Sequence, residues 1–327
     1  MRKRNSIAGM AATIAFVITN SHTVQAQEFP PQKPVTMVVG FAAGGAADLA
    51  ARLIAKELSE TVGQSVVVDN KAGAGGNIAH GQVAKGPKDG SMLLFGSVGP
   101  LTISPHLMKV NYDPFKDLAP ISGGVYFPNV LVVHKGTGIT TFEAFIQRAK
   151  EHPNTVEYAS SGAGSASHLT GELLSQKAGA PMVHVPYKGG APALQDLLGE
   201  RVASYFAAPP TAMPYVETDK LTALATTGLQ RPAYLPNVPT VAESGFPGFD
   251  ALNWYAFVAP AGTPETILEK WNHALVQVLN KPDVKEALQK HGLTPHPTTR
   301  QELAEFIRSE DQKWKKVIQD GQLKTQN

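Results

Sequence analysis

Short apolar runs alternate with amphipathic stretches along most of the chain, and their lengths predict strands and helices in turn. Residues 34–39, 65–69 and 92–95 are apolar runs of strand length. Residues 46–62 repeat apolar positions at the spacing of one helical face, with Arg, Lys and Glu on the opposite face, and residues 76–84 are a second helix candidate. This alternation predicts an α/β architecture with parallel sheets.

The same pattern continues in the second half of the chain. Further strands are predicted at residues 129–133, 156–159, 183–185, 203–207, 221–226 and 254–258. Helices are expected after the second and third of these strands and at residues 141–151, where Thr140 and Glu143 have the spacing of a capping box. Pro and Gly make residues 230–249 a long irregular connection, and two amphipathic helices follow at 264–279 and 299–320.

The N-terminus has the pattern of a secretory signal peptide. Arg2, Lys3 and Arg4 precede an apolar run over residues 7–18, and Val24-Gln25-Ala26 forms a small-residue cleavage pattern. The run is shorter than the ~20 apolar residues that span a bilayer. A buried N-terminal helix is the alternative, but the basic start and the polar change at Thr19 favour a signal peptide at 1–26 and a periplasmic location. The chain has no cysteine, which excludes a lipid anchor and disulfides.

Charge and length narrow the function class. The chain carries +2, but residues 1–26 contain three basic and no acidic side chains, so the remainder carries −1. This near-neutral balance gives no indication of nucleic-acid binding. After residue 26 no apolar segment is long enough for a membrane span, and the length suits two domains.

Three glycine-rich turns lie between a predicted strand and the start of a helix, at residues 40–48, 73–77 and 160–168. Glycine lets the backbone approach a ligand closely, and the free N–H groups of a helix start bind anions. The third turn adds hydroxyls, which also donate to carboxylates. Lys71 is the one cation near these turns. These turns predict a site in which neutral donors bind a small anion. The alternative is that they are ordinary strand–helix turns, which contain Gly and Ser for geometric reasons alone.

Other chemistries fit poorly. None of the turns completes G-x-G-x-x-G, and neither a Walker motif nor a G-x-S-x-G elbow occurs. The ten histidines are scattered, with no H-E-x-x-H motif, so no metal site is expected. His168 lies in the third turn, and we expect it to pack against or cap the helix that follows; proton transfer is the less favoured role. Asp48 either stabilises the first turn of its helix or accepts from an ammonium group of a ligand.

Several motifs resemble the Bug-type substrate-binding proteins of tripartite tricarboxylate transporters. They cover essentially all of the chain after residue 26, in one order, and they comprise residues 41–52, 69–77, 158–169, 185–189, 236–243 and 257–264. The chain departs from the family pattern at Ala43, where Pro is frequent, and at Ala203, where Asp is common. The first departure is expected to loosen the entry loop slightly and the second to concern lobe packing.

The resemblance implies two α/β lobes of the type II periplasmic-binding-protein kind, joined by crossover strands. Lobe 1 is expected at residues 27–128 plus 251–327 and lobe 2 at 129–250. A ligand carboxylate is expected to be bound by backbone amides and hydroxyls of two loops, with rim contacts from Ser97 and Tyr187. The site residues implied are Phe41, Ala43, Gly44, Gly45, Ala46, Asp48, Ser97, Ser160, Gly162, Ala163, Gly164, Ser165, His168 and Tyr187.

The function implied is capture of a small carboxylate by a monomeric protein, without cofactor or turnover, for delivery to membrane permease subunits. Dicarboxylates, aromatic carboxylates and acidic amino acids all remain open as ligands. A receptor module that presents ligand to a membrane sensor is one alternative. A periplasmic enzyme that uses the Ser160–His168 loop is the other.

Overall fold

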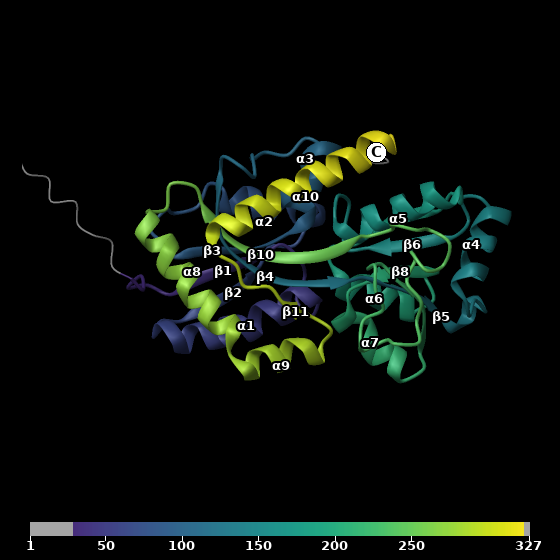
Figure 1. Cartoon of the computed structure of the whole chain (residues 1–327), viewed down its shortest axis with the longest axis horizontal. Helices are drawn as coiled ribbons and strands as arrows, with labels where there is room; N and C mark the ends of the chain where they lie inside the picture. Colours follow the sequence, from purple (N-terminus) through teal and green to yellow (C-terminus); the bar gives the residue numbers. More distant parts are fainter. Residues whose placement is uncertain (1–28, 324–327) are drawn as a thin grey trace, which may run out of the picture.

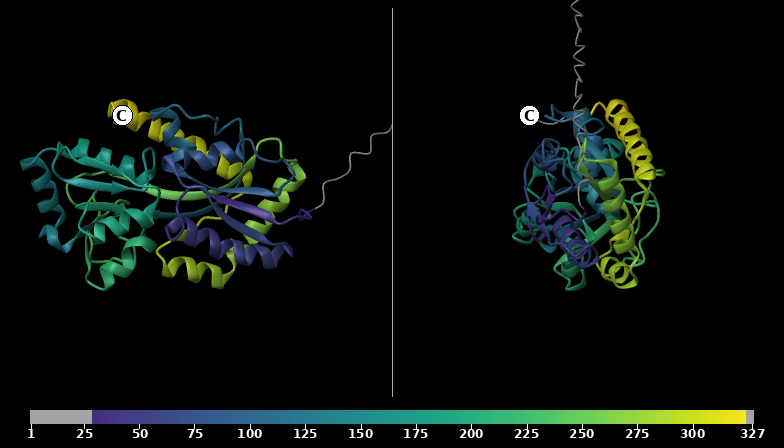
Figure 2. Two further views of the ribbon diagram at one scale, coloured as in Figure 1. Left: turned by 180° about the vertical axis from the view of Figure 1, so that it is seen from behind. Right: turned by 90° about the vertical axis from the view of Figure 1, so that its left-hand side faces the viewer.

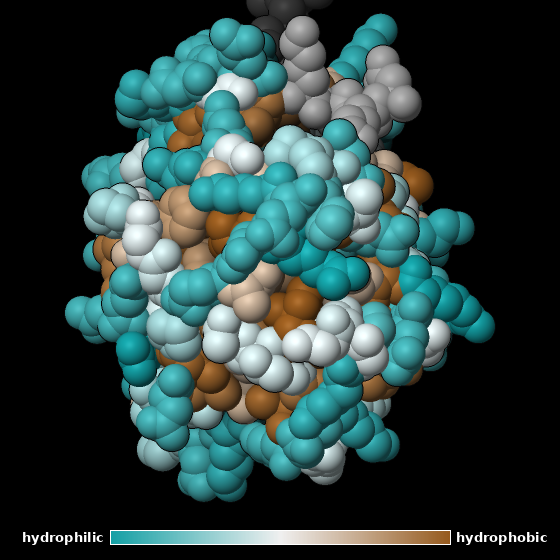
Figure 3. Space-filling view, turned by 90° about the vertical axis from the view of Figure 1, so that its right-hand side faces the viewer, coloured by the Kyte–Doolittle hydropathy of each residue, from teal (hydrophilic) through white to brown (hydrophobic). Residues whose placement is uncertain are grey.

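The computed structural model describes residues 29–323, which form two α/β lobes side by side along the long axis of the molecule (Figure 1). The expected signal peptide, residues 1–26, lies outside the described residues. Within 29–323, no helix combines the length and apolar character that crossing a membrane requires. On the face at the lobe 2 end, polar side chains separate small apolar patches (Figure 3).

Lobe 1 is built on a six-stranded sheet in the order β11-β4-β10-β3-β1-β2. Its strands are β1 (Val35–Val39), β2 (Val66–Asn70), β3 (Met92–Ser97), β4 (Leu118–Pro128), β10 (Leu252–Pro260) and β11 (Thr294–Pro295). The helices and helical turns are α1 (Ala46–Val62), the turn Ala74–Gly76, α2 (Asn77–Val83), the π-helical turn Gly99–Ile103, α3 (Ser104–Leu107), α8 (Glu265–Asn280), α9 (Pro282–Lys290) and α10 (Arg300–Asp320).

The alternation of side chains along β1 explains why helices cover both faces of this sheet. Val35, Met37 and Val39 pack in the core under α1, α8 and α9. Val38, which points the other way, packs in the core under α2 and α10. A strand buried on both faces reads as a continuous apolar run, which is the pattern of this segment.

Lobe 2 is built on a five-stranded sheet in the order β7-β6-β8-β5-β9. Its strands are β5 (Val130–His134), β6 (Glu157–Ser160), β7 (Val183–Pro186), β8 (Ser204–Ala207) and β9 (Leu221–Thr226). Its helices and helical turn are the turn Lys135–Thr137, α4 (Phe142–Glu151), α5 (Ala166–Ala178), α6 (Gly190–Leu198) and α7 (Pro209–Glu217). The core residues place α4 and α5 on one face and α6 and α7 on the other.

Two connections run between the lobes, and they can be followed from the front in Figure 1 and from behind in Figure 2. In the first, β4 continues through Asn129 into β5, and in the second the chain returns from β9 through an irregular segment into β10. Thr227 joins them: its N–H donates to the Asn129 carbonyl at 3.0 Å and its hydroxyl to the Ala251 carbonyl at 2.9 Å. The Asn129 N–H donates to the Thr227 hydroxyl at 2.9 Å. These hydrogen bonds hold the chain at Asn129, Thr227 and Ala251 together at one point between the lobes, which is where a hinge would act.

One hydrophobic core is shared by the two lobes. Leu303 and Trp314 of α10 belong to the same buried cluster as Leu173 of α5 and Phe145 of α4. The end of α10 also accepts a hydrogen bond from lobe 2, from the Gln176 amide to the Gly321 carbonyl at 2.8 Å. Apolar packing thus continues from one lobe into the other.

The structure corrects four details of the sequence reading. The sheets are mixed and not purely parallel, because β10 runs antiparallel to β3 and β4, and β5 antiparallel to β8 and β9. Helices α7 and α9 were not predicted. The long strand β4, with its Pro and paired Gly, was missed. The cap of α4 is Thr141, whose hydroxyl accepts from the Ala144 N–H at 3.1 Å, and not Thr140.

Candidate functional site

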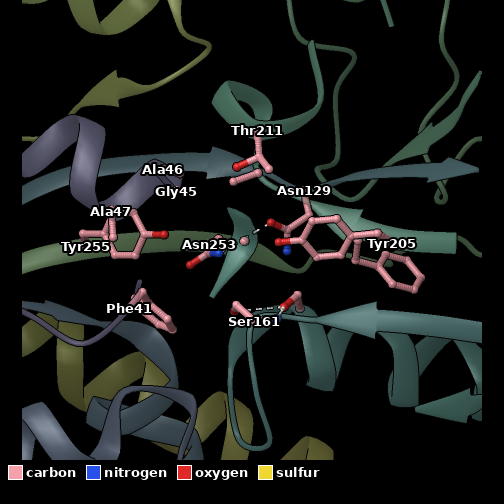
Figure 4. Close-up of a pocket in the computed structure, with 14 residues that line it drawn as sticks. Phe41, Gly45, Ala46, Ala47, Asn129, Ser161, Tyr205, Thr211, Asn253 and Tyr255 are labelled. Carbon is pink, nitrogen blue, oxygen red and sulfur yellow. Dashed lines mark hydrogen bonds between the residues drawn. The ribbon is translucent and has the colours of Figure 1, made fainter. Parts of the chain in front are cut away.

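A small cavity of about 20 Å³ lies between the lobes. A water molecule needs about 10–15 Å³ of such space, so the lobes leave room for about one water-sized group at this point. The cavity is lined from both lobes by Phe41, Gly45, Ala46, Ala47, Asn129, Ser161, Ser167, Gly190, Tyr205, Phe206, Ala208, Thr211, Asn253 and Tyr255 (Figure 4).

The start of four helices lies at this cavity. Gly45 precedes α1, Ser167 is in the first turn of α5, Gly190 is the first residue of α6, and Ala208 precedes α7. The reason is topological: each helix follows a strand whose carboxyl end points toward the other lobe, and ligands bind beyond the carboxyl ends of such strands. Each helix start carries a partial positive charge of about +0.5. The cavity therefore has an environment that favours anions.

The helix starts differ in the donors that they offer. The first-turn N–H groups of α1 and α6 have no intrahelical acceptor, which leaves them free to bind an anion. The α7 helix begins with Pro209 and Pro210, which have no N–H, and the Thr211 N–H donates to the Ala208 carbonyl at 2.9 Å. Helix α7 thus contributes its dipole and the Thr211 hydroxyl, but no free amide in its first turn.

Serine hydroxyls line the start of α5. The hydroxyl oxygens of Ser161 and Ser167 lie 3.2 Å apart, and Ser167 also accepts from the Ser161 N–H at 3.0 Å. The Ser165 hydroxyl, which caps α5, lies 3.2 Å from that of Ser167. In a chain of hydroxyls each member donates once, so if Ser165 donates to Ser167 and Ser167 to Ser161, the proton of Ser161 is left for a ligand.

Asparagine and tyrosine side chains complete the cavity. Asn129 lies in the first connection between the lobes and Asn253 on β10, and the Asn253 side-chain amide donates to Oδ1 of the Asn129 side chain at 3.5 Å. Tyr205 of β8 and Tyr255 of β10 turn their hydroxyls toward the same central space (Figure 4). Burial raises the pKa of both tyrosines, so both hydroxyls remain protonated donors.

No Lys, Arg, Asp or Glu is among the residues that line this cavity. Recognition there depends on helix starts, hydroxyls and amides, with Phe41, Phe206 and three alanines as apolar walls. A buried carboxylate is held well by several such neutral donors. The composition suits a small ligand that brings its own negative charge.

Asp48 supports the first loop from behind. Its carboxylate accepts from the Gly44 N–H at 3.0 Å and from the Arg52 guanidinium at 2.9 Å, and Arg52 also donates to Asn70. Burial raises the pKa of Asp48, but the hydrogen bonds from Arg52, Gly44 and Asn70 outweigh it and hold the pKa below its usual value. Asn70 in turn donates to the Phe41 carbonyl at 3.0 Å. These contacts favour the structural interpretation of Asp48.

The glycines of the third turn, Gly162 and Gly164, meet lobe 1, whereas Ser161 and Ser167 of the same turn line the cavity. The Gly164 carbonyl accepts from the Ser104 hydroxyl at 3.3 Å, and its oxygen lies 2.5 Å from where a β-carbon on Gly99 would stand. A β-carbon on Gly75 would likewise collide with the Ala163 carbonyl. Elsewhere the Ala42 N–H donates across the lobes to the Lys188 carbonyl at 3.0 Å. The lobes are therefore in direct contact, and glycine at these positions permits the contact.

A pair of histidines lies beneath the third turn. His168 and His184 stack with ring centroids 3.9 Å apart, and the Gly164 N–H donates to His168 Nδ1 at 3.1 Å. Burial lowers the pKa of His168 to about 4 and that of His184 to about 3, so both rings are neutral near pH 7. His184 Nε2 lies 2.6 Å from the Ser160 hydroxyl, but Ser160 is fully buried and also accepts from the Gly162 N–H. With His168 buried and His184 half-buried, this pair supports the third turn from beneath.

Three of the fourteen residues expected at the site line the cavity: Phe41, Gly45 and Ala46. The lining does not include the other eleven. Ala43 and Gly44 are exposed to solvent, and Tyr187 donates to Asp196 at 2.9 Å. Ser97 is buried, without a partner for its hydroxyl. The ligand-binding role of all fourteen stays a prediction.

Sequence reasoning missed most of the lining residues. Ala47, Ser161 and Ser167 fall inside the glycine-rich turns that the sequence marks as candidates. Asn129, Tyr205, Thr211 and Asn253 lie at strand ends and a helix start, where nothing in a single sequence marks them as facing the opposite lobe. A polar residue at the end of an apolar run was the one available signal.

Comparison with known proteins settles the family. A model described as the tripartite tricarboxylate transporter family receptor matches residues 50–323. The chain is a member of this receptor family. Protein BugT of Bordetella pertussis is 37% identical over 292 residues, which cover 89% of this chain and 90% of that protein.

Solved structures of similar proteins share the architecture of this receptor. The periplasmic binding protein BugD is 32% identical with a TM-score of 0.86, covering 90% of this chain and 99% of that one. A protein of R. palustris solved with adipate is 35% identical, with a TM-score of 0.86 and 90% and 98% coverage. MatC from Rhodopseudomonas palustris with bound malate is 32% identical, with a TM-score of 0.84 and 88% and 99% coverage.

These matches confirm the two-lobe periplasmic-binding-protein fold and the family expected from the sequence motifs. The receptor is thus a periplasmic solute-binding protein, and its family consists of binding proteins and not enzymes.

Proposed function

We propose that this receptor captures a small carboxylate between its lobes and delivers it to permease subunits in the membrane. The observation that carries the proposal is the convergence of four helix starts on a cavity lined by neutral donors. The adipate and malate that the two similar structures hold are both carboxylates, which supports the same ligand class here.

One carboxylate is bound by groups from both lobes. Lobe 1 contributes the N–H groups of Ala46 and Ala47 at the start of α1, and lobe 2 contributes the Gly190 N–H and the Ser161 hydroxyl. The two helix starts are close together, since a β-carbon on Gly45 would stand 3.6 Å from the Gly190 nitrogen. A ligand bound at both helix starts therefore stabilises the arrangement in which the lobes touch.

Capture follows from this shared binding. When the lobes move apart at the crossing of Asn129, Thr227 and Ala251, the ligand keeps donors from one lobe only. A ligand with differential affinity for the closed arrangement shifts the population toward it. The permease would then recognise the closed receptor. Export by the signal peptide at 1–26, the division of the lobes at residues 129 and 251, and a monomeric state belong to the same proposal.

The first test is a thermal-shift screen of a carboxylate panel on protein freed of carried-over ligand. A ligand that binds only the folded state raises the melting temperature, by an amount that grows with its concentration relative to Kd. Ser161→Ala should reduce the shift, whereas Ser309→Ala, which removes an exposed hydroxyl of α10, should leave it unchanged. A panel in which no carboxylate raises the melting temperature would refute the ligand class.

Delivery is tested separately in cells. Uptake of the carboxylate that scores in the screen should fall when the receptor gene is deleted and return with the wild-type gene. Unchanged uptake would show that the receptor serves another purpose, such as presenting the ligand to a sensor.

A further inference from the structure

We propose that Tyr234 sets the ligand affinity of this receptor from outside the cavity, by making closure of the two lobes less favourable. Its hydroxyl loses contact with water when lobe 1 closes over it and gains no hydrogen bond in return. Tyr234 is not among the residues that line the cavity, so this role needs no contact with the ligand. The inference rests on the proposed capture by lobe closure and adds a residue that favours the open arrangement.

The turn between α9 and β11 is the part of lobe 1 that reaches Tyr234. The end of α9 faces α7 of lobe 2 (Figure 1). A β-carbon on Gly292, in this turn, would stand 2.6 Å from the β-carbon of Pro209, the first residue of α7. The same β-carbon would stand 3.0 Å and 3.1 Å from Cε1 and Cζ of the Tyr234 ring. Because Cζ carries the hydroxyl, the polar end of the ring lies against lobe 1.

The two sides of this contact belong to different lobes. The Gly292 N–H donates to the Gln289 carbonyl at 2.9 Å, and the Leu293 N–H donates to the Leu288 carbonyl at 3.1 Å. Leu293 is fully buried in the core of lobe 1, so the turn moves with that lobe. Tyr234 packs against the core of lobe 2. When the lobes separate, they therefore part between Gly292 and Tyr234.

The Tyr234 hydroxyl is buried, and it has no hydrogen-bond partner among the described residues. Burial raises the pKa of Tyr234, so the hydroxyl keeps its proton and is an unpaired donor. A buried polar group without a partner is unfavourable because it has given up its hydrogen bonds to water. Opening the lobes uncovers this end of the ring and returns it to water. The unfavourable free energy thus applies to the closed arrangement.

A free-energy cost that applies to the closed arrangement weakens ligand binding. The apparent affinity falls in proportion to the fraction of receptor that is in the binding-competent arrangement. An unpaired buried hydroxyl lowers the ratio of closed to open receptor by roughly 5- to 150-fold. A receptor that passes its ligand to a membrane partner has to reopen, and a less stable closed arrangement reopens more readily. Tyr234 therefore exchanges affinity for release.

Tyr234→Phe tests this role, because it removes the hydroxyl and keeps the ring. Isothermal titration calorimetry on receptor freed of carried-over ligand, with succinate and adipate as probes, should show a Kd at least about fivefold lower than that of the wild type. Stopped-flow measurements should show slower dissociation, since the variant reopens less often. The factor should be the same for both probes, because Tyr234 lies outside the cavity. Small-angle scattering of the ligand-free variant should show a more compact receptor.

Tyr215→Phe is the matched control. Tyr215 is another half-buried tyrosine that packs against the core of lobe 2, and its hydroxyl is not among the buried atoms without a partner. This variant should bind both probes with wild-type affinity. A gain of affinity in Tyr215→Phe equal to that in Tyr234→Phe would overturn the inference.

Three results for Tyr234→Phe would also overturn it. An unchanged Kd with a higher melting temperature would show that the hydroxyl is buried in both arrangements. Weaker binding would show that the hydroxyl stabilises closure, and a factor that differs between succinate and adipate would place it at the ligand. If no carboxylate binds the wild type, the proposed function fails, and the scattering of the ligand-free variant still decides the role of Tyr234: unchanged compaction rejects it.

Discussion

The contact between Gly99 and the third glycine turn is a place where one methyl group should prevent closure. A β-carbon on Gly99 would stand 2.5 Å from the Gly164 carbonyl oxygen and 3.0 Å from the Ser165 α-carbon. Comfortable contact between such atoms needs about 3.5–4.0 Å. Both obstacles are backbone atoms of the other lobe, so in Gly99→Ala the lobes must stand roughly 1 Å further apart at this point.

The cost falls on the closed state alone. Gly99 does not have a positive φ, so alanine fits its backbone conformation, and opening the lobes removes the collision. Overpacking of this kind costs about 1–3 kcal/mol, which corresponds to a roughly 5- to 150-fold rise in Kd when binding requires closure. The melting temperature without ligand should change little.

Calorimetry with the ligand found in the screen measures the change in Kd, and small-angle scattering measures compaction when ligand is added. Gly63→Ala is the control: it lies at the end of α1 with φ +69° and no atom within 4 Å, so it should lower stability by about 1 kcal/mol without touching lobe 2. Wild-type affinity in Gly99→Ala would show that ligand binding does not need this contact. If Gly99→Ala weakens binding only as far as it lowers the free energy of unfolding, the collision with the third turn is not what prevents closure.

Two further predictions concern buried titratable side chains. Asp48→Asn should lower the free energy of unfolding by about 1–2 kcal/mol, since it weakens the charge-assisted hydrogen bonds from Arg52 and Gly44. Calorimetry should show that the variant binds succinate and aspartate with equally reduced affinity; a loss of affinity for aspartate alone would place Asp48 at the ligand. The neutral ring of His168, with a folded pKa near 4 against about 6.5 unfolded, should make stability fall by roughly 2 kcal/mol between pH 7 and 5 in urea titrations. Because the unfolded chain binds the proton, His168→Gln should reduce this fall, and an unchanged pH profile would contradict the burial argument.

The architecture was predictable because it depends on patterns local to the chain. The apolar run of β1 and the helical spacing of apolar positions in α1 appear directly in the sequence, and the predicted helix at 46–62 coincides with the structure. Elements with weak local signals were missed. Helix α7 starts with two prolines and contains Pro214, and β4 contains Pro120 and adjacent glycines, so neither segment resembles an ordinary helix or strand.

The cavity was harder to predict because it depends on how the lobes face each other. The glycines of the third turn are expected at the ligand, and the structure places lobe 1 against them: a β-carbon on Gly162 would stand 2.8 Å from the Gly75 nitrogen, and one on Gly164 would stand 2.5 Å from the Ser104 hydroxyl oxygen. Glycine permits close approach to any partner, and a sequence does not say whether that partner is a ligand or another loop. Residues such as Tyr205 and Asn253 face the cavity only because the two connections set the orientation of the lobes.

The hydrophobic core shared through α10 has a consequence for how this receptor unfolds. Two lobes with separate cores would melt in separate steps, but Trp314 and Leu303 pack in one cluster with Leu173 and Phe145. Exposing that cluster in one lobe removes apolar contacts from the other, so the free energies of the two lobes are coupled. The receptor is therefore a single cooperative unit in thermodynamic terms, even though its binding motion is a movement of two bodies.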